Sequence, residues 1–259
     1  MSEPEGTHFR GPIWEGVYKH FKDTPQLGGG YDNGPWATRS LAKLAELRGH
    51  SDSTKTIPET VIYESSLLPF LAAIVSERRE PVMILDFGGG VGITYVAAVD
   101  GLAEGRIEYL VLENGNICFA GQSAFSDDSR ISFDTSVPEN REVDIVHFGS
   151  SLHYVEDWKA ILAQLAALHP KYFLLTDLPA GDIPTFATVQ TFYGSKIPCW
   201  FFSLDEISAH FRDLGYKLVF KSSFRGTYFG VRQDIPQSNF PEEFRIRNTC
   251  SILFSRSLE

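Results

Sequence analysis

From Pro81 onward, the chain alternates between short apolar runs and segments with helical hydrophobic spacing. Continuous apolar runs suit strands that are buried on both faces, as in a parallel sheet. Helical segments between such strands are typical of βαβ units. The pattern therefore predicts an α/β fold with a doubly wound, mostly parallel, seven-stranded sheet. The predicted strands are Val82–Phe87, Ile107–Leu112, Ile131–Phe133, Val143–Phe148, Tyr172–Thr176, Lys217–Phe224 and Cys250–Ser255.

The last predicted helix carries signals at both of its ends. Ser203 and Glu206 form a capping box at its start, and Gly215 ends it. The segment at 233–244, between the last two predicted strands, is long enough to be a lid or a disordered insertion.

The first 80 residues are predicted to form a lead-in and a helical cap, followed by an α/β domain over residues 81–259. Residues 1–34 are rich in glycine, proline and aromatic residues, which is typical of a loose lead-in. Apolar residues recur at helical spacing from Trp36 to Leu47, and a second helical region runs up to residue 80. We expect Pro69 to break or kink that region.

A glycine-rich turn follows the first predicted strand of the sheet, at Gly88, Gly90 and Gly92. Glycine allows a tight turn and the close approach of a ligand to the main chain. The dinucleotide fingerprint is incomplete because Ile93 stands where its last glycine is required, and no Gly-Lys-Ser/Thr of a P-loop is present. The motif that fits is acidic-x-Gly-x-Gly-x-Gly, beginning at Asp86. A carboxylate there suits a ligand that carries an ammonium and a sulfonium better than a pyrophosphate.

Acidic residues also follow the next two predicted strands. The Glu113 carboxylate can accept hydrogen bonds from both hydroxyls of a ribose, an interaction that dinucleotide enzymes share. Asp134 lies beyond the third strand, where it either accepts the exocyclic amine of an adenine or is a solvated loop aspartate.

These motifs resemble those of the class I S-adenosylmethionine-dependent methyltransferases. The resemblance rests on DFGGGVG, Glu113 and the stretch DIVHFGSSLHYVED, and it covers residues 81–177. It implies a Rossmann-like sheet and S-adenosylmethionine as the cofactor. The implied cofactor-binding residues are Asp86, Gly88, Gly90, Glu113, Asp134 and Ser150.

A narrower resemblance extends over most of the chain. Gly30-Tyr31-Asp32, YFLLTDLPAG, VQTFYGSKIPCWFFS and CSILFSR are similar to segments of methyltransferases found among bacterial surface-polysaccharide genes. This resemblance implies an acceptor that is a sugar or is linked to one, and a place in polysaccharide biosynthesis.

Methyl transfer from a sulfonium requires an aligned acceptor and, for a hydroxyl, removal of a proton. We predict His153, in the loop after the fourth strand, as the general base; the alternatives are packing beside the cofactor or exposure to solvent. Asp177 follows the fifth strand directly and is predicted to orient a hydroxyl or hold a metal, unless it caps a turn. His147, inside a strand, is predicted to be a satisfied core histidine. The remaining histidines lack ligand spacing, so no metal site is expected.

An aromatic segment before the last predicted helix supplies candidates for binding the acceptor. Gln190, Tyr193 and Trp200 are predicted to form a wall against a sugar ring, and packing in the core or between subunits is the alternative. Tyr31 and Trp36 either fold over the donor as part of a cap or serve only in packing.

Charge and composition limit the classes of partner and the cellular location that we expect. The chain carries 33 acidic and 23 basic residues, a net charge of −10, which repels phosphate backbones and makes nucleic acid an unexpected partner. Three cysteines do not form a disulfide framework, and no secretory signal or membrane-spanning run is recognised, so we expect a cytoplasmic protein that does not insert into membranes. A homo-oligomer is compatible with the sequence.

The sequence therefore predicts an S-adenosylmethionine-dependent methyltransferase that O-methylates a small sugar or sugar-linked molecule. The alternatives are N-methylation of an amino sugar or amine, a nicotinamide-dependent oxidoreductase or epimerase, and a binding module that has kept the donor pocket without the chemistry.

Overall fold

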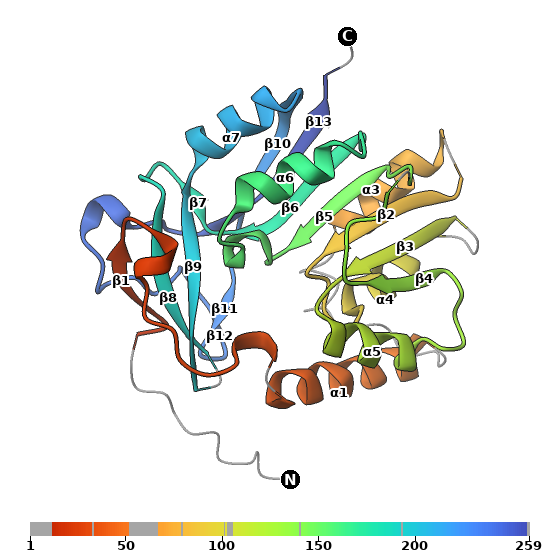
Figure 1. The fold of residues 1–259 in the computed structure, drawn as a ribbon, viewed down its shortest axis with the longest axis horizontal. Helices are drawn as coiled ribbons and strands as arrows, with labels where there is room; N and C mark the ends of the chain where they lie inside the picture. Colours follow the sequence, from red (N-terminus) through yellow and green to blue (C-terminus); the bar gives the residue numbers. More distant parts are fainter. Residues whose placement is uncertain are drawn as a thin grey trace.

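The computed structural model describes residues 12–32, 34–51, 67–78, 80–100, 102, 106–139, 141–192 and 194–257. Its centre is a seven-stranded sheet of order β10-β13-β6-β5-β2-β3-β4 (Figure 1). Neighbouring strands are parallel from β4 to β6, whereas β13 pairs antiparallel with both β6 and β10. The predicted α/β fold is confirmed. The strands are β2 (Val82–Phe87), β3 (Ile107–Leu112), β4 (Ile131–Asp134), β5 (Ile145–Gly149), β6 (Tyr172–Leu178), β10 (Tyr216–Phe224) and β13 (Thr249–Arg256).

Helices cover both faces of this sheet, because both faces of its strands are apolar. On β2, Val82 and Ile84 pack into one core cluster, whereas Met83 and Leu85 pack into another. The first cluster includes side chains of α1 (Gly34–Ser51), α3 (Leu67–Ser76), α4 (Ile93–Asp100) and α5 (Gly115–Ala124). The second includes side chains of α6 (Trp158–Ala166) and α7 (Leu204–Asp213).

A second, smaller sheet lies beside the first, with order β1-β8-β9-β7. Its strands are β1 (Trp14–Tyr18), β8 (Phe186–Phe192), β9 (Ser195–Ser203) and β7 (Ala180–Gly181). The aromatic segment thus forms a β-hairpin, which the sequence analysis does not predict. The lead-in contributes β1, which pairs antiparallel with β8. The division of the chain at residue 80 stays a prediction.

Several local predictions can be compared with the structure. One half of the capping box is confirmed: the Ser203 side chain accepts a hydrogen bond from the Glu206 backbone N–H, whereas the Ser203 backbone N–H donates to Thr185 Oγ1 at 2.9 Å and not to the Glu206 side chain. Gly215, which follows the C-cap residue Leu214 of α7, has φ +87°. The helix is not broken at Pro69, because α3 runs through this residue from Leu67 to Ser76. Residues 57–66 of the predicted second helical region lie outside the described residues.

The segment at 233–244 packs into the molecule and is not a disordered insertion. Ile235 and Phe240 are buried in a third core cluster with Trp14 and Phe201 of the smaller sheet. The buried Gln237 side chain accepts a hydrogen bond from a neighbouring backbone N–H at 2.9 Å. The rings of this cluster join the segment to the hairpin.

Candidate functional site

A groove runs across the carboxyl ends of β2, β3 and β4. Two neighbouring hollows of about 490 and about 410 Å³ share the lining residues Phe87, Gly88 and Glu113, and together they are here called the glycine-loop groove. Its other lining residues are Tyr31, Trp36, Leu112, Asn114, Thr135, Ser136, Val137, Gly149, Ser150, Ser151, Tyr154, Val155, Ile161, Gln164 and Phe192.

The glycine turn is tight because the chain's own atoms surround it. Gly88 and Gly90 have φ values of +68° and +60°, which side chains rarely adopt. A Cβ on Gly88 would lie 2.6 Å from the Ser151 Cβ, and one on Gly90 would lie 3.2 Å from the Trp36 ring. The backbone of Gly88 lines the groove, and the ring of Trp36 from α1 lies over Gly90.

Glu113 occupies the centre of the groove. It follows β3 and lines both hollows, and its Oε2 accepts hydrogen bonds from Asn114 N at 2.8 Å and Asn114 Nδ2 at 3.2 Å. Asp134, at the end of β4, is exposed, and its Oδ1 accepts hydrogen bonds from the backbone N–H groups of Thr135 and Ser136. Asp134 Oδ1 therefore stabilises the turn at Thr135 and Ser136, and both of these residues line the groove.

Aromatic rings close the other end of the groove. The Tyr31 ring lies 4.9 Å from Tyr154, 5.5 Å from Trp36 and 5.7 Å from Phe192, measured between centroids. Tyr31 Oη donates to Tyr154 Oη at 2.7 Å, and Tyr154 Oη donates to Gln190 Oε1 at 2.6 Å. Burial and the neighbouring Tyr31 raise the pKa of Tyr154 well above its ordinary value, so this hydroxyl stays protonated. Tyr31 and Trp36 thus cover the glycine turn. Gln190 holds the Tyr154 side chain in place through its hydrogen bond.

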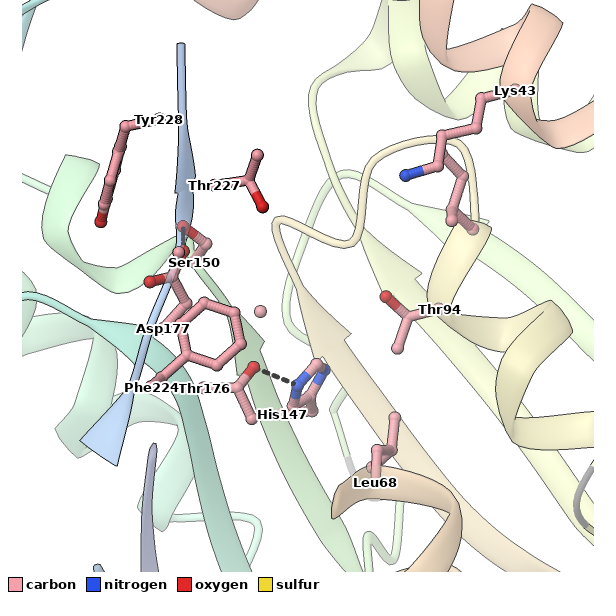
Figure 2. Close-up of a pocket in the computed structure, with 13 residues that line it drawn as sticks. Lys43, Leu68, Thr94, His147, Ser150, Thr176, Asp177, Phe224, Thr227 and Tyr228 are labelled. Carbon is pink, nitrogen blue, oxygen red and sulfur yellow. Dashed lines mark hydrogen bonds between the residues drawn. The ribbon is translucent and has the colours of Figure 1, made fainter. Parts of the chain in front are cut away.

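A further cavity of about 290 Å³ shares the lining residues Gly149 and Ser150 with the groove, and we call it the Asp177 cavity (Figure 2). Ser150 directly follows β5, whereas Asp177 is the penultimate residue of β6, and their φ values are +57° and +52°. Such left-handed conformations are costly for residues with a side chain and persist where the surrounding structure imposes them. The Ser150 hydroxyl donates to Asp177 Oδ2 at 3.0 Å, and the Thr249 hydroxyl donates to Oδ1 at 2.6 Å. The cavity is lined by Lys43, Leu68, Ile93, Thr94, His147, Gly149, Ser150, Thr176, Asp177, Phe224, Gly226, Thr227 and Tyr228.

No family model matches this chain. No curated protein matches it either. Solved structures do: a Burkholderia thailandensis 1,6-didemethyltoxoflavin-N1-methyltransferase, with bound 1,6-didemethyltoxoflavin and S-adenosylhomocysteine, superposes with a TM-score of 0.53 at 13% identity, covering 90% of this chain and 94% of that one. The chain has the class I methyltransferase fold.

Two further structures with this fold are similar over most of their length. An S-adenosylmethionine-dependent methyltransferase from Clostridium acetobutylicum gives a TM-score of 0.51 at 10% identity, covering 85% of this chain and 98% of that one. Magnesium protoporphyrin IX methyltransferase from Synechocystis, with bound S-adenosylhomocysteine, gives 0.50 at 12% identity, covering 86% and 96%. At such identities the similarity establishes the class I methyltransferase fold and not the substrate.

Within this methyltransferase fold, Asp86 does not face the groove, contrary to the prediction that it binds the cofactor. It is fully buried, its Oδ2 accepts a hydrogen bond from Tyr109 Oη at 2.6 Å, and its Oδ1 lies 2.7 Å from His147 Nδ1. Side chains alternate along a strand, so Asp86 points to the same face of β2 as Val82 and Ile84. The prediction that it contacts the donor directly is therefore wrong.

His153 is also buried, and it lines neither the groove nor the Asp177 cavity. It lies in the short 3₁₀ turn Leu152–Tyr154, where its ring packs 4.1 Å from that of Tyr154. Burial lowers its pKa to about 3, which makes it a weak base. The prediction of His153 as the general base is wrong, because the tight turn directs Tyr154 and not His153 to the groove.

His147 is a satisfied core histidine, as predicted: Nδ1 pairs with Asp86 and Nε2 lies 3.1 Å from Thr176 Oγ1. Its ring nevertheless borders the Asp177 cavity, which the sequence analysis does not foresee (Figure 2). The sequence of β5 offers a weak signal, since His147 is the one polar side chain in this strand.

Trp200 does not belong to the site. Its ring packs 5.4 Å from Phe21, and its Nε1 donates to the Glu156 carbonyl at 3.1 Å, outside both the groove and the Asp177 cavity. The reason is alternation along β9, where the neighbouring Cys199 and Phe201 are fully buried in the third core cluster. The prediction of Trp200 as an acceptor-binding residue is wrong. Tyr193 lies outside the described residues.

Over the residues that the structure describes, no group of three or more His, Cys, Asp or Glu side chains could hold a metal ion. Among the described helices, none combines the length and the apolar character that a membrane crossing requires.

Proposed function

We propose that this protein is an S-adenosylmethionine-dependent methyltransferase that O-methylates a hydroxyl of a small sugar or sugar-linked molecule. The observation that carries the proposal is the junction at Ser150. There, a groove with a central carboxylate, Glu113, meets a cavity that presents a second carboxylate, Asp177. The sugar part rests on the resemblance described under Sequence analysis.

The residues of the groove fit the donor. Glu113 would hold the ribose hydroxyls, with the backbone of Gly88 against the rest of the ligand. Asp134, which adjoins the groove residues Thr135 and Ser136, would hold the adenine amine. Aromatic faces attract a cationic centre within about 6 Å, so Tyr31 and Trp36 suit a sulfonium. When bound, S-adenosylmethionine supplies a methyl group on a positively charged sulfur.

The Asp177 cavity fits the acceptor. A carboxylate accepts the hydrogen bond of a hydroxyl and holds its oxygen toward Ser150, where the groove begins. Leu68, Phe224 and Tyr228 give this cavity an apolar wall of the kind that packs against a sugar ring. Gln190 acts indirectly, by fixing Tyr154.

We place this activity in the cytoplasm. Cys118, Cys199 and Cys250 are buried and unpaired, which is compatible with a reducing compartment. The net charge of −10 supports a small-molecule acceptor over a nucleic acid.

The test is a methyl-transfer assay with S-adenosylmethionine labelled in the methyl group and a panel of sugars, nucleotide sugars and amino sugars. We expect label in a hydroxyl-derived methyl ether, and loss of that label in Asp177→Asn. Label only on nitrogen would replace O-methylation by N-methylation. Binding of a nicotinamide dinucleotide, with no binding of S-adenosylhomocysteine, would overturn the proposal.

A further inference from the structure

Three polar side chains connect the interior of the sheet to the wall of the Asp177 cavity. Asp86 Oδ1 lies 2.7 Å from His147 Nδ1, and His147 Nε2 lies 3.1 Å from Thr176 Oγ1. Figure 2 shows the second of these contacts at the edge of the cavity. The residues come from β2, β5 and β6, which are adjacent in the sheet. Their exposed fractions are 0%, 2% and 9%, so exposure increases toward the cavity.

The hydrogen-bonding capacities of these groups fix a direction along the chain of contacts. An ionised carboxylate only accepts hydrogen bonds, so the nitrogen facing Asp86 carries the imidazole proton. His147 Nε2 is then an acceptor, and the Thr176 hydroxyl is its donor. Tyr109 Oη donates to the other oxygen of Asp86 at 2.6 Å, and burial together with the Asp86 charge raises the pKa of Tyr109, which keeps it a donor. The Thr176 oxygen retains lone pairs with which it can accept a hydrogen bond from a molecule in the cavity.

We infer that Asp86, His147 and Thr176 form a proton relay that deprotonates the acceptor hydroxyl. The inference rests on the proposed function. The acceptor O–H bond breaks and its proton passes to Thr176 Oγ1, while the Thr176 proton passes to His147 Nε2. The freed lone pair of the acceptor oxygen forms the new O–C bond to the methyl group, and the electron pair of the broken S–C bond stays on sulfur. The Asp86 carboxylate stabilises the imidazolium until it returns its proton to solvent.

The relay and the neighbouring Asp177 carboxylate have different roles. Asp177 already accepts hydrogen bonds from Ser150 and Thr249 and orients the acceptor. Thr176 touches the acceptor, whereas His147 and Asp86 act through Thr176 as positioning residues. Such a relay serves an acceptor that must lose a proton, and an amine with a free lone pair does not need it. The acceptor class is therefore a hydroxyl.

The first test needs no acceptor. Nitrogen NMR of uniformly ¹⁵N-labelled protein reports which imidazole nitrogen carries the proton, and the signals of His147 among the seven histidines are assigned by their loss in His147→Gln. We expect a protonated Nδ1 and an unprotonated, hydrogen-bonded Nε2 whose resonance shifts in Thr176→Val. A proton on Nε2 in the wild-type protein would overturn the relay.

The second test uses the acceptor found in the methyl-transfer assay and compares Thr176→Val with Thr176→Ser. Valine keeps the shape and removes the hydroxyl, so kcat should fall by about 100-fold or more. Serine should restore most of this loss, and calorimetry should show S-adenosylhomocysteine affinity within about twofold of wild type in both variants. Unchanged kcat in Thr176→Val with normal ligand binding would overturn the relay and leave the proposed function standing. If the wild-type protein neither binds S-adenosylhomocysteine nor transfers methyl groups, the proposed function falls and the relay falls with it, whatever hydrogen bonds the nitrogen NMR shows.

Discussion

Replacing Glu113 by alanine should weaken the binding of S-adenosylhomocysteine without altering the groove elsewhere. The side chain lines both halves of the groove, and one of its oxygens already accepts two hydrogen bonds from Asn114. We assign the ribose hydroxyls to this carboxylate. A hydrogen bond to a charged group contributes about 1.5–3 kcal/mol, which corresponds to a loss of about 10-fold to about 150-fold in affinity.

Isothermal titration calorimetry measures this loss directly. Glu113→Gln keeps the shape and one acceptor oxygen and should lose less affinity than alanine. Glu108→Ala is the matched control, because Glu108 is an exposed carboxylate on the same strand, outside the groove, paired with Arg141. Thermal unfolding separates a binding defect from the loss of the Asn114 contacts. Wild-type affinity in a folded Glu113→Ala variant would remove Glu113 from the donor site and refute this reasoning.

Three further changes test other parts of the site. Gly90→Val should abolish S-adenosylhomocysteine binding in calorimetry, because the added Cβ lies 3.2 Å from the Trp36 ring. Gly215→Val is the control: this glycine also has a positive φ, but its added Cβ has no atom within 4 Å, so the variant should bind normally. Binding retained by Gly90→Val would contradict the role of the glycine turn. Asp177→Asn should lower methyl transfer by about 100-fold with little change in donor affinity, and full turnover would exclude its orienting role. His153 is neutral and buried when folded, so the unfolded chain binds more protons as pH falls from 6.5 toward 3 and stability decreases there. Between pH 7 and 5, urea unfolding of the wild-type protein should lose about 2 kcal/mol more than that of His153→Phe, and equal losses would refute the burial argument.

The seven-stranded sheet was predictable because its signals are local. Each central strand is an apolar run, and the chain alternates strand with helix, so the fold class follows from patterns within about 30 residues. The smaller sheet was not predictable in this way. β1 pairs with β8, roughly 170 residues later, and no periodicity in either segment records that partnership.

The site was only partly predictable. Glu113 and Ser150 follow strands and line the groove, as position after a strand predicts. Asp86 also precedes the glycine turn, and the sequence does not show which way it points, because both faces of β2 are apolar and buried. His153 could not be separated from Tyr154 by sequence, because a three-residue turn has no reliable period and the fold decides which side chain meets the groove.

The most direct test of the central claim is a crystal structure of the protein soaked with S-adenosylhomocysteine. The account predicts the ribose hydroxyls within hydrogen-bonding distance of the Glu113 carboxylate, with the sulfur at the Ser150 junction and facing the Asp177 cavity. A ligand bound elsewhere, or a groove that stays filled by Tyr31 and Trp36 at saturating ligand, would contradict it.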